Sequence, residues 1–290
     1  MSADPKLSSW EEAVVWFRNQ PEQKQVARDA FYDDPLTDAA ARYHASEEWR
    51  AVSEILHSRH GRALDVGAGR GIASYALARD GFEVTALEPD PSAIVGSAAI
   101  RKLAQDAGLA IDVVEEVSER LPFADESFDV VFARAVLHHM TNLEQACREI
   151  YRVLKPGGIA IAVREHVISR DSDLQKFLDQ HPLHRLYGGE HAFRLDRYVN
   201  ALSAAGFRPL EVIAPLANAI NLFPYTVDSL RNAVVSRLSR NLPVPGLRAI
   251  LKSDTVFKFA LMVAARFDNR PGRLYSFVGH KSQGCAFRTG

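Results

Sequence analysis

The sequence predicts an α/β fold in which helices cover both faces of a parallel, doubly wound sheet. From residue 62 onward, short apolar runs alternate with longer segments of helical character. These runs are apolar throughout, as is typical of parallel strands that are buried on both faces. The first run leads directly into a cluster of three glycines, after which a helical segment begins at once. Together these observations favour a strand–turn–helix unit at the start of the sheet.

Residues 1–60 are expected to form a helical cap before the sheet. Ser9 and Glu12 have the spacing of a capping box, in which each side chain satisfies a free amide at the other residue. A second helix is expected to start at Pro21, because a proline in the first turn loses no hydrogen bond. A third helix is expected to run from a cap at Thr37 to Gly61.

The core of the chain is expected over residues 61–220 and 272–282. Its helices are expected at 72–79, from a cap at Asp90 to Gly108, from a Thr141–Glu144 capping box through Leu154, and from a cap at Asp196 to Gly206. Residues 166–191 are rich in loop signals. The strands are expected at residues 63–66, 82–87, 111–114, 128–133, 159–164, 207–213 and 274–278.

Residues 221–271 are expected to be a helical insertion before the last strand. Helical signals fall at 227–238, 247–251 and 255–267, and residues 221–270 hold eight Lys/Arg against three Asp/Glu. One interpretation is a lid over the substrate pocket, with solvated arginines and an inward apolar side formed by Phe257, Phe259, Leu261 and Met262. The other is an amphipathic surface for an anionic lipid, a membrane face or a partner.

Composition narrows the class of protein. The 290 residues are 47% hydrophobic and 24% charged, as in ordinary globular proteins, and 35 basic residues face 36 acidic ones. This balance argues against wholesale binding of nucleic acid. Two cysteines exclude a disulfide scaffold, and neither a leader nor an apolar stretch long enough for a membrane span is evident. We therefore expect a cytoplasmic, soluble protein without a transmembrane segment.

The glycine cluster at Gly67, Gly69 and Gly71 is the strongest local motif. Glycines let a backbone approach a ligand closely, and the helix that follows presents free amides. The spacing is GxGxG, with Ile72 where a dinucleotide fingerprint would place its third glycine. Glu88 ends the next strand, where a carboxylate can accept hydrogen bonds from both hydroxyls of a ribose. A carboxylate placed to bind a ribose, without a loop that binds phosphate, suits a ligand in which a nucleoside is joined to an amino acid.

Five segments follow one another in the order and spacing of a known family. In these segments the chain resembles the class I S-adenosylmethionine-dependent methyltransferases of the small-molecule type, closely over residues 60–165 and plausibly over 192–213. The resemblance implies a Rossmann-like sheet of seven strands with the last antiparallel, and S-adenosyl-L-methionine as cofactor with S-adenosyl-L-homocysteine as product. The segments are 65–71 (DVGAGRG), 87–90 (LEPD), 121–131 (LPFADESFDVV), 135–139 (AVLHH) and 149–158 (EIYRVLKPGG).

The resemblance also implies roles for individual residues. Asp65 would support the loop and the cofactor's ammonium, Glu88 would hold the ribose, and Pro89 would lie against the adenine. Where the family often has Asp-Ala near the adenine, this chain has Val117-Ser118, so Glu116, Glu119 or a backbone carbonyl would replace the acid. The residues expected along the methionine moiety are Gly67, Ala68 and Gly69, with Gly71 completing the loop.

Two further residues are placed near the cofactor by the same resemblance. Arg134 follows the fourth strand, where it would pair either with the cofactor carboxylate or with a neighbouring acid. Tyr43 belongs to the N-terminal helical segment that often closes over the cofactor in this family. We expect Tyr43 to contribute to such a lid.

Histidines supply the candidate catalytic groups. His138 and His139 follow the fourth strand and His166 follows the fifth, and any of them could take a proton from an attacking alcohol. The polar residues expected in the loop that roofs the same pocket are His181, His184, Tyr187, Glu190 and His191. Their spacing compels no metal site, so we expect no metal.

The leading hypothesis is a methyltransferase that acts by in-line displacement on an oxygen, nitrogen or carbon of a small molecule, in a site closed by the helical caps. An anionic or lipid-linked acceptor and a peripheral contact with a membrane fit the basic insertion. Ala133-Arg134-Ala135-Val136 stands where adenine-N6 methyltransferases of nucleic acid have Asn/Asp-Pro-Pro-Tyr/Phe, and no Pro-Cys pair occurs in that region, so nucleic acid is not the expected substrate. The alternatives are a non-catalytic regulatory protein that binds the cofactor, and a nicotinamide-dependent oxidoreductase. Oligomeric state is not indicated.

Overall fold

The sheet is the centre of the structure, a computed structural model that describes residues 6–241 and 253–283. Its order is β3-β2-β1-β4-β5-β8-β7, and the short β6 pairs with β5 off this path. The first five strands are parallel, and β8 is antiparallel to both β5 and β7. The predicted doubly wound sheet with an antiparallel last strand is confirmed. The strands are β1 (Arg62–Val66), β2 (Glu83–Leu87), β3 (Ile111–Val114), β4 (Phe128–Arg134), β5 (Leu154–Ile168), β6 (Phe193–Arg194), β7 (Leu210–Ile213) and β8 (Arg273–His280).

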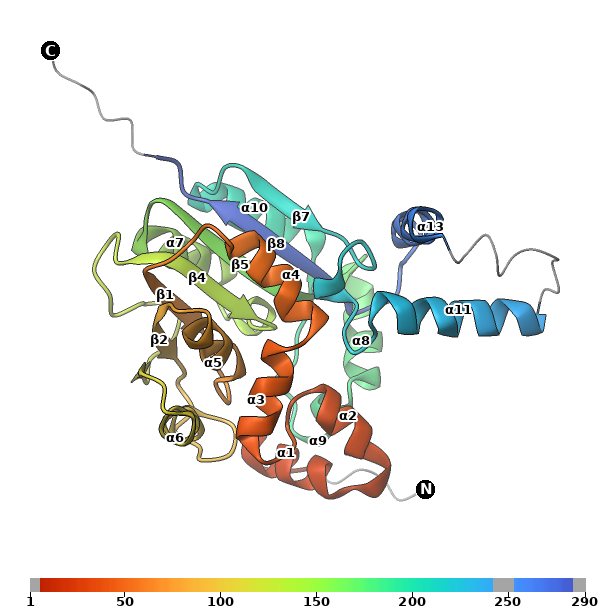
Figure 1. Cartoon of the computed structure of the whole chain (residues 1–290), viewed down its shortest axis with the longest axis horizontal. Helices are drawn as coiled ribbons and strands as arrows, with labels where there is room; N and C mark the ends of the chain where they lie inside the picture. The colour runs from red at the N-terminus through yellow and green to blue at the C-terminus, as the bar shows by residue number, and fades with distance from the viewer. Residues whose placement is uncertain (1–5, 242–252, 284–290) are drawn as a thin grey trace, which may run out of the picture.

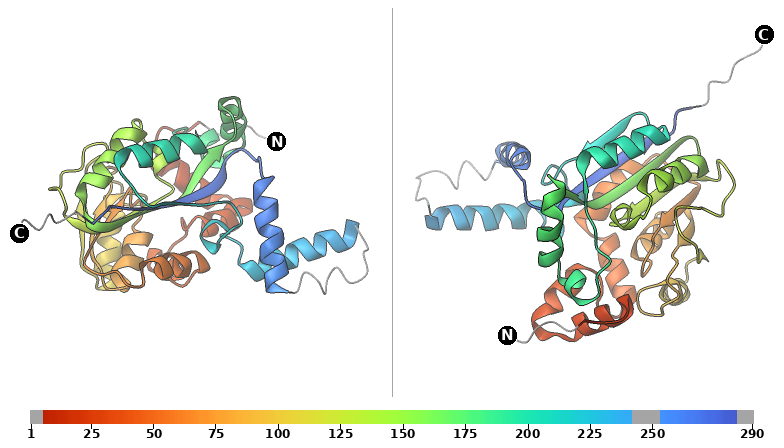
Figure 2. Two further views of the ribbon diagram at one scale, coloured as in Figure 1. Left: turned by 90° about the horizontal axis from the view of Figure 1, so that it is seen from above. Right: turned by 180° about the vertical axis from the view of Figure 1, so that it is seen from behind.

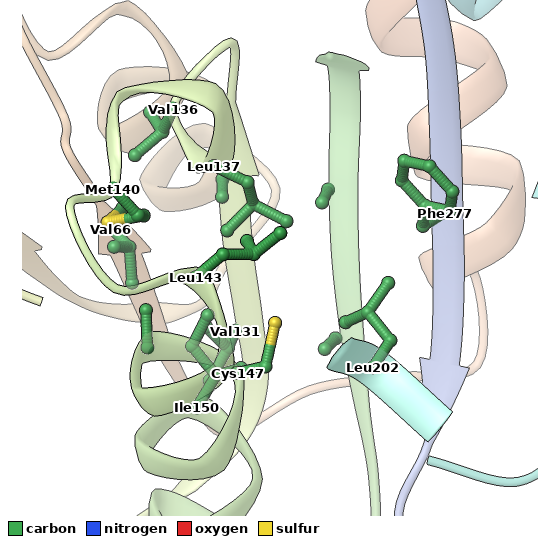
Figure 3. Close-up of a cluster of buried hydrophobic side chains, with 14 of the residues drawn as sticks. Val66, Val131, Val136, Leu137, Met140, Leu143, Cys147, Ile150, Leu202 and Phe277 are labelled. Atoms are coloured by element: carbon green, nitrogen blue, oxygen red, sulfur yellow. The ribbon is translucent and has the colours of Figure 1, made fainter. Parts of the chain in front are cut away.

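Helices cover both faces of the sheet, which Figure 2 shows edge-on in its left view. On one face, α7 (Leu143–Val153) and α10 (Leu195–Ala205) bury Leu143, Cys147 and Leu202 against Val131 of β4 (Figure 3). The other face is covered by α4 (Glu47–Leu56), α5 (Ile72–Arg79) and α6 (Ser97–Ala107). Strand order reverses between β1 and β4, and such a switch point leaves a crevice at the carboxyl ends of the strands.

The N-terminal segment is helical, as predicted, but it is divided differently. It contains α1 (Trp10–Asn19), a 3-10 turn η1 (Pro21–Gln23), α2 (Lys24–Asp29), α3 (Leu36–His44) and α4. The single helix expected from Thr37 to Gly61 is wrong. The Oγ of Ser46 accepts a hydrogen bond from the Trp49 amide at 3.0 Å, so Ser46 caps a new helix.

Three helix starts also differ from the prediction, and the capping box of α1 forms only in part. Ser9 Oγ accepts from the Glu12 amide as expected, but Glu12 accepts from the amide of Ser8. Asp90 accepts from the Ser92 amide in a turn, so α6 begins only at Ser97. Asn142, not Thr141, caps α7 by accepting from the Gln145 amide. The start of α10 follows Arg194, which places Asp196 in the first turn rather than at the cap.

Segment lengths differ at β5, at β7 and in the loop-rich stretch. β5 begins at Leu154 and runs through the glycines at 157 and 158, whereas β7 is shorter than predicted. The stretch expected to be loop contains η3 (Asp171–Asp173), α8 (Leu174–Gln180) and α9 (Pro182–Leu186).

The insertion contributes α11 (Val227–Asn241) and α13 (Asp254–Arg266), after the 3-10 turn η4 (Ala219–Asn221). The helix expected at 247–251 lies outside the described residues. Phe257 and Leu261 are buried against α11, but Phe259 and Met262 are 62% and 51% exposed, so the expected inward position of these two is wrong. Both helices project away from the sheet (Figure 1). None of the helices within the described residues is long and apolar enough to cross a membrane.

Candidate functional site

A cavity of about 560 Å³ lies at the carboxyl ends of β1, β2 and β4. We call it the main cavity. One wall is the glycine loop after β1, and another is residues 87–90 at the end of β2. Residues 116–119 and 134–136 line it from the sheet side, and Trp10, Phe31 and Tyr32 line it from the N-terminal helices. Within the described residues, α11 and α13 contribute nothing to its lining.

The glycine loop follows β1 in a backbone conformation that glycine favours. Gly67, Gly69 and Gly71 have φ of 62°, 55° and 84°. A Cβ on Gly67 would stand 2.7 Å from Val136 Cγ1, whereas one on Gly69 would meet nothing closer than 4.0 Å. Gly67 to Gly69, with Ala68 between them, line the main cavity. Gly71 does not line it, because it starts α5 and packs against Ile100.

Two carboxylates line the cavity beside this loop. Asp65 accepts a hydrogen bond from Ser74 Oγ at 2.6 Å, and burial raises the pKa of Asp65 to about 7 although Ser74 opposes the shift. Glu88 accepts from the amides of Gly69 at 2.7 Å and Asp90 at 2.9 Å. Burial raises the pKa of Glu88 despite these two bonds. Pro89 lies next to Glu88 in the same wall.

Residues 116–119, which were expected near the adenine, line the cavity. Val117 is 51% exposed and offers only an apolar side chain. Ser118 is buried, with its Oγ 2.7 Å from Met140 Sδ. Glu119 accepts from the Thr141 amide at 2.9 Å, which ties this segment to the loop after β4. Glu116 also lines the cavity, with an exposed carboxylate.

Arg134 lines the cavity and pairs with a neighbouring acid. Its Nε and Nη2 donate to the carboxylate of Glu48 at 2.7 and 3.1 Å. Burial opposes the charge of Arg134, but the Glu48 carboxylate outweighs it and raises the pKa. Arg164 Nη1 lies 3.6 Å from the same fully buried carboxylate. Of the two predicted partners for Arg134, the structure therefore shows the acid within the chain.

Trp10, Phe31 and Tyr32 form an aromatic wall of the cavity, and none of the three was predicted from the sequence. Tyr43 is fully buried and does not line the cavity, so its expected place there is wrong. Phe31 stands between Tyr43 and the cavity, with ring centroids 5.3 Å apart. Arg70, inside the glycine motif, donates to the carbonyl of Phe31 at 3.0 Å and so holds this segment on the loop. The feature of the sequence that could have indicated this contact is a bulky charged residue, Arg70, between two glycines.

The loop after β4 and its His138 are held by Glu165, which was not predicted from the sequence. This fully buried carboxylate accepts from the amides of Val136, Leu137 and His138 at 3.0 to 3.1 Å. It also lies 2.7 Å from His138 Nδ1. Burial lowers the pKa of His138, but the carboxylates of Glu165 and Glu190 outweigh burial and raise it to about 9. The feature of the sequence that could have indicated this role is a glutamate, Glu165, within a mostly apolar strand.

The three candidate catalytic histidines have different surroundings. His139 lines the main cavity, and burial together with the nearby His138 lowers its pKa. His138 is 2% exposed and does not line the cavity, and neither does His166. Burial and the charge of His138 lower the pKa of His166 to about 3.

The roof of the cavity is the segment before β6. Tyr187 and Glu190 line the cavity as expected, whereas His181, His184 and His191 do not. His181 nevertheless approaches Glu190, its Nδ1 lying 3.8 Å from the carboxylate. Burial opposes ionisation of Glu190, but the surrounding imidazoles lower its pKa to about 2.

Comparison with known proteins gives consistent similarities. A family model described as a methyltransferase domain matches residues 64–162. The chain is 30% identical over 157 residues to a ubiquinone biosynthesis O-methyltransferase of Azorhizobium caulinodans, covering 52% of this chain and 60% of that protein. It is 33% identical over 135 residues to a demethylmenaquinone methyltransferase of Chlorobaculum parvum, covering 44% and 53%. The match thus spans a little over half the length of these relatives.

A solved structure shows the same fold over most of this chain. It is the complex of Haemonchus contortus phosphoethanolamine N-methyltransferase 2 with S-adenosyl-L-methionine, with a TM-score of 0.55. The two sequences are 18% identical, and the match covers 96% of this chain and 61% of that one. At this identity the likeness is one of fold.

Proposed function

We propose that this chain is a class I S-adenosylmethionine-dependent methyltransferase that transfers a methyl group from S-adenosyl-L-methionine to a small-molecule acceptor. The match of residues 64–162 to a methyltransferase domain supports this proposal. The observation that carries this proposal is that the glycine loop and Glu88 open into one cavity at the switch point of the sheet. A ligand with both a ribose and an amino acid moiety suits that pair of walls.

The residues present fit this cofactor. Glu88 offers two carboxylate oxygens for the ribose hydroxyls, and the open space above Gly69 leaves room for the methionine chain. Asp65 would face the ammonium group, whose charge favours the ionised carboxylate. Pro89 and Ser118 would flank the adenine, with Glu116 as the acid nearest in role to the family's aspartate. Arg134 would use the nitrogen not engaged by Glu48 for the cofactor carboxylate.

The sulfonium activates its own methyl group, so the protein must align an acceptor and exclude water. Among the candidate bases, His139 fits best. It faces the cavity, and its lowered pKa leaves it neutral near pH 7, so it can take a proton. His138, charged between two carboxylates, would position the loop after β4 instead.

The acceptor side of the cavity favours an aromatic small molecule. Trp10 lies 6.2 Å from Tyr32 and 6.3 Å from Tyr187 between ring centroids, and all three line the cavity. Such a wall suits a flat ring. The relatives, which are named as a ubiquinone biosynthesis O-methyltransferase and a demethylmenaquinone methyltransferase, support a ring with an oxygen or carbon nucleophile.

A lipid-linked acceptor and a peripheral membrane contact are a further part of this proposal. Phe259, Met262 and Phe267 of the insertion are 62%, 51% and 77% exposed, beside the basic Lys258 and Arg266. An apolar surface rimmed by lysine and arginine is typical of segments that lie on anionic membranes.

The first test is calorimetric titration of S-adenosyl-L-methionine, S-adenosyl-L-homocysteine and NADH. We expect micromolar binding of the first two ligands and none of NADH. Glu88→Ala should weaken binding about 10- to 100-fold, because a partly buried charged hydrogen-bond acceptor is lost. Glu83→Ala, at the exposed start of the same strand, is the matched control and should bind normally. Folded protein that binds neither sulfur ligand would refute the proposal.

Turnover is the second test. A donor with an isotopically labelled methyl group is incubated with a panel of hydroxylated aromatic acceptors, and labelled product is measured. Binding of the cofactor without transfer to any acceptor class would favour a regulatory cofactor-binding protein over an enzyme.

A further inference from the structure

Four histidines and one glutamate from distant parts of the chain meet at the edge of the main cavity. His138 and His139 belong to η2 (Leu137–His139), His166 to β5, His181 to the cap of α9, and Glu190 to the segment before β6. Ring centroids are 4.2 Å apart for His138 and His139, 4.7 Å for His138 and His166, and 5.6 Å for His166 and His181. We call these five residues the histidine cluster.

Glu190 is the centre of the histidine cluster, and its carboxylate faces three imidazoles. The residue is only 8% exposed. Its oxygens lie 3.6 Å from His138 Nε2, 3.8 Å from His139 Nε2 and 3.8 Å from His181 Nδ1. All three distances exceed those of a hydrogen bond. They are close to the separation of about 3.3 Å between two ligands on one tetrahedral metal with bonds near 2.0 Å.

The outer nitrogens of the histidines are already held. His139 Nδ1 lies 3.0 Å from the carbonyl of Gly189, and His166 Nδ1 lies 3.0 Å from the carbonyl of Gly272. A carbonyl only accepts, so each Nδ1 carries a proton and each neutral ring keeps its Nε2 lone pair. His138 Nδ1 faces the Glu165 carboxylate at 2.7 Å, so Nε2 is the nitrogen that would release its proton when a cation binds. Metal-binding histidines are oriented in this way, by a carbonyl or carboxylate on the far nitrogen.

We propose that His138, His139 and Glu190 bind one divalent transition-metal ion at the edge of the main cavity. One ligand atom from each of the three residues lies within 4.8 Å of the others. The ligand atoms of His166, His181 and Glu190 meet the same limit, but His139 lines the main cavity whereas His166 and His181 do not. Two imidazoles with one carboxylate suit Zn²⁺, Co²⁺ or Fe²⁺ and not Mg²⁺, which prefers oxygen ligands.

The site would have an open position, because His139 and Glu190 line the cavity in which we place the acceptor. This deepens the proposed function, on which it rests, by favouring an oxygen acceptor. With His139 bound to the ion through Nε2, the ion would replace His139 as the group that promotes loss of the proton, because a hydroxyl bound to the metal would lose its proton to solvent more readily. Its oxygen then forms the bond to the methyl carbon, while the pair of the broken carbon–sulfur bond stays on S-adenosyl-L-homocysteine.

The test uses the full-length, untagged protein after treatment with a chelator that is then removed. Zn²⁺, Co²⁺ and Mg²⁺ are titrated by calorimetry, and Co²⁺ is also followed by its visible absorption. We expect one equivalent of Zn²⁺ or Co²⁺ and no Mg²⁺. His139→Ala and Glu190→Gln should each weaken Zn²⁺ binding at least 100-fold. His57→Ala, at the exposed end of α4, is the control and should leave it unchanged.

Three outcomes would overturn the proposal. These are no stoichiometric Zn²⁺ binding, equal binding in the control and in the cluster variants, and loss in His181→Ala but not in His139→Ala, which would place the ion elsewhere. Titration of S-adenosyl-L-homocysteine keeps the two proposals separate. Its affinity should stay within about threefold in His139→Ala and Glu190→Gln, and a protein that binds Zn²⁺ but not this ligand would refute the proposed function alone.

Discussion

At the scale of single residues, Gly67 and Gly69 allow the cost of backbone strain to be measured apart from the cost of steric overlap. Alanine at Gly67 or Gly69 would take a left-handed conformation, which destabilises a fold by about 1–2 kcal/mol. Gly67→Ala would in addition press on Val136, for which overpacking adds about 1–3 kcal/mol. We therefore expect Gly67→Ala to lower the free energy of unfolding in urea by more than Gly69→Ala does. The double variant Gly67→Ala/Val136→Ala should recover part of the difference, and equal losses in both single variants would contradict this.

Asp65 predicts a particular dependence of stability on pH. Its pKa is raised to about 7 in the folded protein from 3.8, chiefly by burial. Between these two values the folded state keeps a proton that the unfolded state has released. The contribution of Asp65 to stability is therefore fully present below about pH 4 and is lost as pH rises to about 7. The free energy of unfolding should change through this one group by at most about 1.4 kcal/mol per pH unit.

The comparison variant for this effect is Asp65→Asn, whose side-chain carbonyl can still accept from Ser74. The free energy of unfolding is measured in urea at several pH values between 4 and 8. We expect the wild type to lose stability relative to Asp65→Asn as pH rises through this range, and then to level off. A difference that grows in favour of the wild type would show that Asp65 is ionised in the fold.

At the scale of elements, the break between α3 and α4 determines the sign of the stability change expected at Ser46. Ser46 caps α4, so Ser46→Ala should lower the free energy of unfolding by about 1 kcal/mol. Were residues 37–61 one helix, the same change would be neutral or stabilising, because alanine is the better residue inside a helix. Thermal unfolding measures the sign. Ser9→Ala, at the cap of α1, should show a loss of similar size.

Strands were easier to predict than helix ends, for a physical reason. An apolar run such as that of β1 or β2 is buried on both faces by the whole fold, so its pattern is visible in the sequence. The start of a helix depends on which of several neighbouring polar side chains makes the cap. Thr141 and Asn142 both suit that role; in the fold the Thr141 amide donates to Glu119, and Asn142 accepts from the Gln145 amide and caps α7.

At the scale of the whole molecule, the two halves of the site differ in what the sequence can predict. The cofactor side lies in consecutive loops at one edge of the sheet, so Asp65, Gly67 and Glu88 could be placed by topology. The histidine cluster joins residues from 138 to 190, whose meeting depends on the path of α8 and α9 over β5. The spacing of these residues in the sequence does not indicate that path. For the same reason Tyr43 was expected in a lid over the cofactor, whereas Phe31 is the residue that lines the cavity.

The insertion allows a test of how far the cofactor site depends on the rest of the molecule. Phe257 is 1% exposed and fixes α13 against α11, whereas neither helix lines the main cavity within the described residues. Phe257→Ala should therefore loosen α13 while leaving the dissociation constant for S-adenosyl-L-homocysteine within about twofold. Phe31→Ala removes a cavity wall and should weaken the same ligand several-fold, which makes it the positive control. Calorimetry on both variants, with circular dichroism to confirm folding, measures the effect. A tenfold loss in Phe257→Ala would contradict this and would mean that the insertion contributes to the cofactor site when the ligand binds.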